Sequence, residues 1–165
     1  MKSFLEPFYI LRINGLGNSA FVGAFSAVNE STWEHLKLDF FPMLVTTIIA
    51  LFLTYINLKC YLHSRLCAII TAITFITVFF YTYTGIIGTN IAVIDISSFV
   101  VAILLGEFVF YKSIKNPKDC NIIFSSIILV VLLLAFVMFT YFPPKIQYFK
   151  DPITDTYGII RSNKH

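Results

Sequence analysis

The sequence predicts an all-α integral membrane protein, a four-transmembrane-helix bundle with an amphipathic or irregular N-terminal segment and an ordered C-terminal tail. Of its 165 residues, 58% are hydrophobic and 13% are charged, and the mean hydropathy is +0.82. A soluble domain has about a quarter of its residues charged, and a small one cannot bury this much apolar surface. The alternation of apolar and polar residues that is typical of a membrane barrel is also missing. The lipid bilayer is therefore the first predicted partner.

Four apolar runs define the predicted spans. They cover about 40–57, 66–87, 91–111 and 122–142, and each is close to the roughly 20 residues with which a helix crosses the hydrocarbon of a bilayer. No repeat or low-complexity segment separates them. The whole of 1–165 is therefore predicted to form a single membrane domain, with 143–165 as its tail.

Positive charges in the short connections predict an orientation in the cell membrane. Connections 58–65 and 112–121 are rich in Lys and Arg, whereas the link 88–90 carries no charge. The positive-inside rule places the two basic connections in the cytoplasm and the tail outside the cell, although the tail has basic residues of its own. The net charge of +3 includes no basic stripe, which argues against a nucleic-acid partner.

The three cysteines fall at or near the predicted cytoplasmic side. Because thiols stay reduced there, Cys60, Cys67 and Cys120 are not expected to need pairing. With His63, Cys60 and Cys67 form a Cys-x2-His-x3-Cys pattern, for which Cys120 would be a distant fourth zinc ligand. Since Cys67 opens a lipid-embedded helix, zinc is not the favoured interpretation.

The most informative polar segment is 26–39, immediately before the first predicted span. In a helix Glu30 and Glu34 share one face, and His35 and Asp39 form a second i,i+4 pair. Two carboxylates and an imidazole are groups that bind a divalent metal or move a proton. The segment is therefore a candidate polar site at the membrane surface.

The same segment also has a structural interpretation. Asn29 is a natural N-cap, and Ser31-x-x-Glu34 fits a capping box that satisfies the first amide groups of a helix. Trp33 is typical of an interface anchor. Pro42 cannot donate to the carbonyl one turn back, so a kink or a new helix is expected there.

A second polar site is expected where the second span meets the third. Asp95 lies about one turn inside the third span, where a carboxylate is energetically expensive and normally faces the protein interior or a wet cavity. A salt bridge or exposure at the interface is the structural alternative. Tyr83 and Thr84 are candidate hydroxyl donors beside it. Glu107 is about three turns away, and we interpret it as structural, neutralised by a nearby lysine.

The tail is expected to be ordered by packing. Pro143 and Pro144 stop the fourth helix, and the surroundings of Asp151 and Tyr157 have the composition of turns. By topology the tail shares one side of the membrane with Asp95 and with the segment around residues 30–35. The three polar segments are thus predicted to meet in one extracytoplasmic pocket.

The polar segments contain specific short motifs. They read VNESTWEHLKL at 28–38, FFPM at 40–43, YTYTG at 81–85, IDIS at 94–97, PP at 143–144, DPIT at 151–154 and YGI at 157–159. Together they resemble a bacterial membrane-protein family of unknown function that is common in Clostridia and their relatives. The resemblance covers most of the chain after residue 20 and implies no activity. It also implies a further hydrophobic span ahead of the first motif, for which 1–12 are too short.

Three classes of function follow from these observations. The first is a structural or accessory protein that binds a protein partner, a second copy or lipid. Its candidate binding residues are Asn29, Lys37, Tyr83, Thr84, Asp151 and Tyr157.

The second class is a membrane-embedded, metal-assisted hydrolase or transferase acting on a lipid or envelope substrate. Its candidate catalytic residues are Glu30, Glu34, His35 and Asp95, and its candidate metal ligands are Glu30, His35 and Asp95. The third class is a small transporter or transporter subunit with Asp95 in a polar path. The sequence has no nucleophile elbow, phosphate loop, HExxH or dinucleotide fingerprint, so it leaves open whether the protein is an enzyme.

Overall fold

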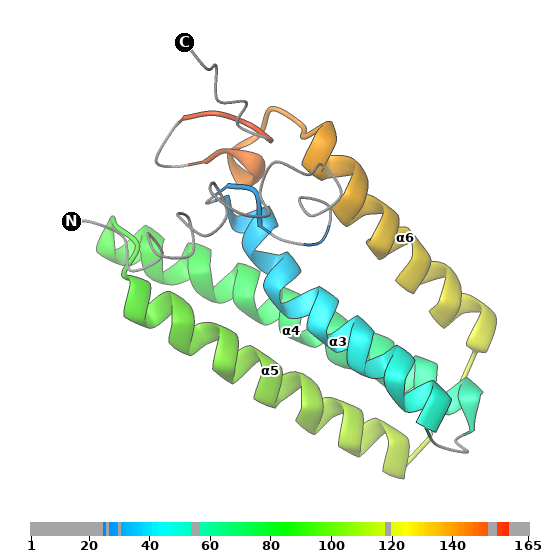
Figure 1. Ribbon diagram of the computed structural model, residues 1–165. Coiled ribbons are helices and arrows are strands. Elements are labelled where there is room, and N and C mark those ends of the chain that lie inside the picture. Colours follow the sequence, from blue (N-terminus) through cyan, green and yellow to red (C-terminus); the bar gives the residue numbers. More distant parts are fainter. Residues whose placement is uncertain are drawn as a thin grey trace. The chain divides into compact units, whose positions relative to one another are not determined.

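The computed structural model describes residues 25, 27–29, 31–53, 57–117, 120–151 and 155–158. Within them, four long α-helices and one short 3-10 helix follow one another (Figure 1). They are α3 (Thr32–Leu53), α4 (Leu58–Ile87), α5 (Ala92–Lys115), α6 (Ile122–Tyr141) and η2 (Gln147–Phe149). The only pairing of extended backbone in these residues is an isolated antiparallel bridge between Lys150 and Tyr157. The all-α class is confirmed.

All four long helices are long and apolar enough to span a membrane. These candidate spans are Thr32–Leu53, Leu58–Ile87, Val93–Lys115 and Ile122–Tyr141. In the most apolar part of each of the last two, only 17% of the residues are buried within the protein. The remaining apolar side chains face outward, where water would be an unfavourable neighbour and lipid tails a favourable one.

The first helix differs from its prediction at its start. α3 begins at Thr32 rather than near residue 40, and it continues through Pro42 without a new helix. The hydropathy of the sequence misplaced this boundary because Glu34, Lys37 and Asp39 are buried inside the protein, with at most 2% of each residue exposed. The segment that we expected to precede the span is therefore the first part of the helix.

The chain divides into two compact units, and the boundaries between them fall within α3 and α6. The first unit comprises 1–38 and 133–165, and the second comprises 39–132. The single membrane domain that the sequence suggests stays a prediction.

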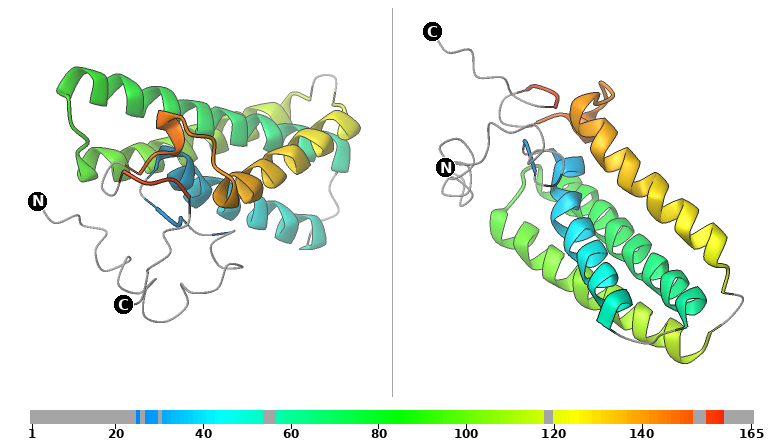
Figure 2. Two further views of the ribbon diagram at one scale, coloured as in Figure 1. Left: turned by 90° about the horizontal axis from the view of Figure 1, so that it is seen from above. Right: turned by 45° about the vertical axis from the view of Figure 1, so that its right-hand side comes forward.

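The second unit is built around an antiparallel hairpin of α4 and α5, which lie side by side (Figures 1 and 2). Asn57 caps the start of α4 by accepting a hydrogen bond from the backbone amide of Lys59 at 3.2 Å. Gly88 ends α4 with a φ of 83°, a left-handed conformation, and its amide donates to the carbonyl of Thr84 at 2.8 Å. These two caps fix the length of α4, the longest of the described helices.

Small residues bring the two helices close together. A Cβ atom on Gly106 of α5 would lie 3.1 Å from the carbonyl oxygen of Ala68 and 3.5 Å from the Cβ of Ala72. Ala68 and Ala72 are completely buried. Within a membrane, where helices gain little from the hydrophobic effect, such close backbone approach provides much of the packing energy.

Candidate functional site

The first unit contains a buried polar cluster of Glu34, Lys37 and Thr140, which we call the Glu34–Lys37 cluster. Nζ of Lys37 lies 2.8 Å from Oε2 of Glu34, and the two side chains are 0% and 3% exposed. Lys37 also donates to the hydroxyl of Thr140. That hydroxyl lies 3.2 Å from Oε1 of Glu34 and 2.8 Å from the carbonyl oxygen of Phe136. Every member of the cluster thus has a hydrogen-bonding partner, as a buried charge requires.

The start of α3 is capped by the residues that the sequence nominated. Oδ1 of Asn29 accepts from the amide of Ser31 at 2.9 Å, and the hydroxyl of Ser31 accepts from the amide of Glu34 at 3.4 Å. The carboxylate of Glu34 reaches back to the amide of Val28 at 2.9 Å instead of that of Ser31. This arrangement satisfies backbone amides at the start of α3, as a capping box does.

Trp33 lies in an aromatic cluster that belongs to the same unit. Its ring centroid is 4.5 Å from that of Phe136, 5.0 Å from Phe149, 5.5 Å from Phe139 and 5.9 Å from Tyr148. Ring pairs at these separations add to the stability gained from burial alone. Trp33 therefore joins the start of α3 to the end of α6 and to η2.

The described tail residues complete this packing. Nδ2 of Asn29 donates to the carbonyl of Gly158 at 3.1 Å, which connects the beginning of α3 with the tail. Gly158 has a φ of 69°, and a Cβ there would approach the ring of Pro143 to 3.0 Å and the carbonyl of Thr140 to 3.2 Å. A larger residue would fit neither the backbone conformation nor the space.

Asp151 and Tyr157 lie in a closed turn of the tail. The amide of Asp151, which is 1% exposed, donates to the carbonyl of Thr156 at 2.9 Å, and its carbonyl accepts from Asp155 at 2.9 Å. Tyr157 is half-buried and pairs with Lys150. The hydrogen bond to Asp155 raises the pKa of the half-buried Lys150. These contacts make the turn a folded element of the tail.

The second unit brings Tyr83 and Asp95 together, as the sequence indicated. The hydroxyl of Tyr83 donates to the carboxylate of Asp95 and accepts from the amide of Ile91 at 3.3 Å. Thr84 instead donates to the carbonyl of Phe80 within its own helix, at 2.6 Å. The Tyr83–Asp95 contact therefore joins the last turns of α4 to the first turn of α5.

Arg65 neutralises Glu107, a role that we assigned to a lysine. Its guanidinium donates to the carboxylate of Glu107 and lies over the ring of Phe110, with 4.2 Å between Cζ and the ring centroid. The Arg65 side chain is 7% exposed and that of Glu107 is 45% exposed. The pair is consistent with the structural interpretation of Glu107.

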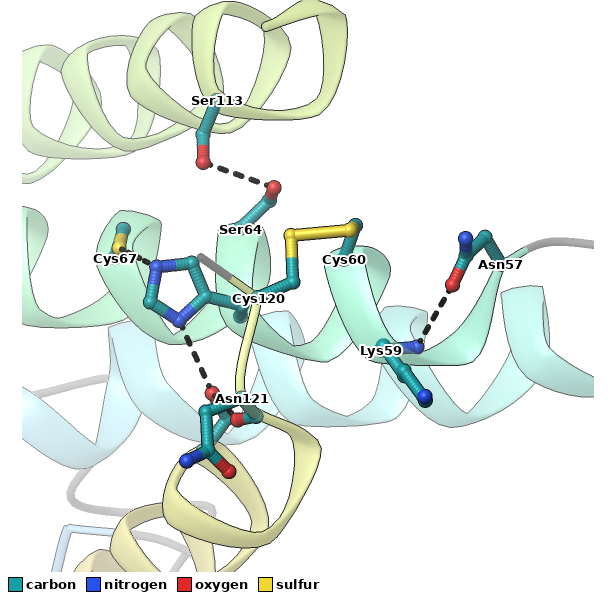
Figure 3. Close-up of a disulfide and its surroundings, with 10 residues drawn as sticks. Asn57, Lys59, Cys60, Ser64, Cys67, Ser113, Cys120 and Asn121 are labelled. Atoms are coloured by element: carbon teal, nitrogen blue, oxygen red, sulfur yellow. Dashed lines mark hydrogen bonds between the residues drawn. A yellow bond between two sulfur atoms is a disulfide. The ribbon is translucent and has the colours of Figure 1, made fainter. Parts of the chain in front are cut away.

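The cysteines differ from their expected state. Cys60 and Cys120 form a disulfide, with 4.9 Å between their Cα atoms, so the expectation that they need no pairing is wrong (Figure 3). Cys67 is a free thiol further along α4. The sequence could not reveal this pair because Cys60 and Cys120 are 60 positions apart. Nearby, the hydroxyl of Ser64 donates to that of Ser113 at 2.9 Å.

The predicted metal site is not brought together in the described part of the chain. Glu30 lies outside the described residues, His35 is half-buried on α3 in the first unit, and Asp95 belongs to the second unit. Among the described residues, no group of three His, Cys, Asp or Glu side chains could hold a metal ion. Of the three polar segments expected to meet, the start of α3 and the tail do so within one unit.

Asp39 is the polar residue whose environment is least satisfied. It is 1% exposed, and neither carboxylate oxygen has a hydrogen-bond partner within the described residues. The i,i+4 hydrogen bond expected from His35 is therefore not formed. A buried carboxylate without a partner loses its hydration and gains nothing in return.

Replacing Asp39 by asparagine is expected to stabilise the protein by about 1–3 kcal/mol, because it removes the buried charge and keeps the shape of the side chain. Thermal unfolding in detergent measures the change. Asp155→Asn is the matched control, because the side chain of Asp155 is 78% exposed and little desolvated. A lower melting temperature for Asp39→Asn would show that the charge of the carboxylate stabilises the fold.

Sequence reasoning missed Thr140 and the pair of His63 and Cys67. One feature of the sequence could have revealed Thr140: it is a hydroxyl-bearing residue near the end of a strongly apolar helix. His63 and Cys67 lie one turn apart on α4, and their side chains approach to 3.8 Å. The sequence pattern suggests only zinc ligation for these two residues.

Four apolar helices and a buried polar cluster define a multi-pass membrane protein. The chain belongs to the family of unknown function DUF6512, whose model matches residues 3–159. No curated protein and no solved structure matches it. The resemblance to a family without an assigned activity is confirmed, and family membership by itself indicates no reaction.

Proposed function

We propose that the protein is a structural or accessory membrane protein whose folded tail binds the lipid surface. The Glu34–Lys37 cluster carries this proposal. Glu34 is 2% exposed and Lys37 is 0% exposed, and both interact with each other and with Thr140. A catalytic group has to reach its substrate. These groups instead hold the start of α3 against the end of α6.

The residues that follow α6 support a lipid-binding role for the tail. Phe142 is 78% exposed and Ile146 is 56% exposed, and the exposed Lys145 lies between them in the chain. Apolar side chains next to a cation suit the boundary where acyl chains meet anionic headgroups. The closed turn of Asp151 and Tyr157, which follows these residues in the chain, is itself a folded element of the tail.

The orientation of the protein is part of the proposal. The basic segments 58–65, which forms the start of α4, and 112–121, which includes the end of α5, favour a cytoplasmic location for that end and an extracytoplasmic tail. The Cys60–Cys120 disulfide weighs against this orientation, because disulfides persist mainly in oxidising compartments. A direct measurement of sidedness is therefore needed.

Bimane labels on the tail test both parts of the proposal. In a Cys67→Ser background with the disulfide intact, Ile146→Cys is labelled and reconstituted into vesicles containing brominated lipid. Strong quenching is expected at Ile146, whereas Thr156→Cys, at an exposed position in the tail turn, is the weakly quenched control. Equal and weak quenching at both positions would overturn lipid binding.

The Thr156→Cys variant also reports the side of the membrane. In intact cells a membrane-impermeant maleimide is expected to label it, because the proposed orientation places the tail outside. Labelling that appears only after the cells are broken would reverse the orientation and leave the lipid-binding result unaffected.

A further inference from the structure

At the Lys-rich end of the second unit, hydrogen bonds link the side chain of a cysteine to that of a histidine, and that histidine to a serine. Sγ of Cys67 lies 3.8 Å from Nε2 of His63, one turn earlier on α4 (Figure 3). Nδ1 of the same imidazole lies 3.3 Å from the hydroxyl oxygen of Ser125 on α6. A nucleophile, a base and a group that orients the base are the parts of an activated nucleophile.

The hydrogen bonds also define which imidazole nitrogen carries the proton. Ser125 donates its own hydroxyl proton to the carbonyl of Asn121 at 2.8 Å, so it offers only lone pairs to His63. Nδ1 of His63 must therefore carry the proton that it donates to Ser125. In the neutral ring this leaves Nε2 as an acceptor, directed at the thiol of Cys67.

The thiol and the imidazole open into a pocket. Its volume is about 530 Å³, within the range of roughly 300–1,000 Å³ that small-molecule sites occupy. Both residues are half-buried, so a small molecule can reach them. The lining residues are His63, Cys67, Val109, Lys112, Ser113 and Asn116.

The remaining lining residues suit a carbonyl substrate with an anionic carrier. Ser113 accepts a hydrogen bond from Ser64, which leaves its own hydroxyl proton available for the oxygen of a reacting carbonyl. Lys112 supplies positive charge for the carrier, and Val109 supplies apolar surface for an acyl chain.

We propose that Cys67, His63 and Ser125 form a nucleophilic thiol site that takes an acyl group from an acyl thioester. Nε2 of His63 removes the proton from Sγ, and Sγ attacks the carbonyl carbon of the donor. The carbon–sulfur bond of the donor then breaks, and its leaving thiolate takes the proton from His63. The products are S-acylated Cys67 and a free thiol, and nothing is oxidised or reduced.

A disulfide between Cys67 and Cys60 is excluded by the geometry of α4. Cys60 precedes Cys67 by seven positions on one helix, which separates their Cα atoms by about 10 Å. A disulfide requires a Cα separation below about 7 Å. Cys67 therefore cannot replace Cys120 as the partner of Cys60 while α4 is intact.

The test uses the full chain in detergent without reductant, so that Cys67 is the only free thiol, and octanoyl-coenzyme A as the probe. Mass spectrometry is expected to show one octanoyl group per chain, on Cys67 and removable by hydroxylamine. Cys67→Ser should abolish the adduct. His63→Gln should slow its formation by about 100-fold or more, the usual contribution of a general base.

Ser125 acts as a positioning residue and needs its own variants. Ser125→Ala should slow acylation, and Ser125→Thr, which keeps the hydroxyl, should restore it. Thr82→Val on α4, the helix of His63 and Cys67, is the control, because within the described residues the Thr82 hydroxyl bonds to the carbonyl of Val78 and should not affect the rate. The melting temperature of each variant separates a slower reaction from a loss of fold.

Two results would overturn the proposal. One is the absence of an octanoyl adduct on the wild-type chain. The other is an equal rate of acylation in the wild type and His63→Gln, at equal stability, because the imidazole would then take no part in the reaction.

Discussion

Replacing Lys37 by methionine is expected to lower the free energy of unfolding by about 3–5 kcal/mol, because it leaves the buried carboxylate of Glu34 without its counter-charge. Methionine has nearly the length of lysine, so the loss of packing is small. The single tryptophan of the chain, Trp33, is stacked on Phe136 in the same unit. Its fluorescence during unfolding in detergent therefore reports this region directly.

Two further variants separate the loss of the pair from the loss of a charge. In the double variant Glu34→Gln, Lys37→Met, no unpaired charge remains, and most of the lost stability should return. Lys150→Met disrupts the pair with Asp155, whose side chain is 78% exposed, and should change stability by less than about 1 kcal/mol. Glu34→Gln and Lys37→Met are also measured as single variants. If the double variant loses as much stability as the two single variants lose together, this account is contradicted.

Enlarging Gly106 is expected to have the second large effect. In Gly106→Ala the new Cβ lies 3.1 Å from the carbonyl oxygen of Ala68, a backbone atom that gives way only if the helices separate. We expect a loss of about 1–3 kcal/mol, the usual range for overpacking, and a larger loss for Gly106→Leu. Unfolding in detergent, followed by circular dichroism, measures both.

Gly85→Ala is the matched control for this prediction. Gly85 also lies within a helix of the hairpin, but no atom is within 4 Å of a Cβ placed there. Alanine should therefore be neutral, or should stabilise the helix by up to about 1 kcal/mol through its better helix propensity. If the alanine variants at positions 85 and 106 are equally stable, close packing at Gly106 is not what holds α4 against α5.

The sequence predicted the helices better than the contacts between them. Four apolar runs are sufficient to find four spans, because the bilayer imposes both composition and length. Hydropathy failed at the start of α3, since it treats Glu34 and Lys37 as residues that avoid the interior. Their pairing with each other and with Thr140 reverses that preference.

Sequence distance limited the prediction of the candidate sites. Tyr83 and Asp95 are 12 positions apart and joined by a short link, so their contact could be anticipated. The hydroxyl of Thr140 is 106 positions from Glu34, and Gly158 is 129 positions from Asn29. Contacts of this kind depend on the packing of whole helices, and no local pattern in the chain records them.

The hydrogen bond from Asn29 to Gly158 also has a consequence for the synthesis of the protein. A chain emerges from the ribosome with its N-terminus first, so α3 is made long before the residues that complete its surroundings. Thr140 and the tail turn are made more than 100 residues later, and only then can they reach the start of α3. A chain that stops before residue 140 keeps Glu34 and Lys37 but lacks the groups that bury them. Closure of the first unit is thereby coupled to synthesis of the chain as far as the tail turn, and a shorter chain exposes polar groups that the longer one buries.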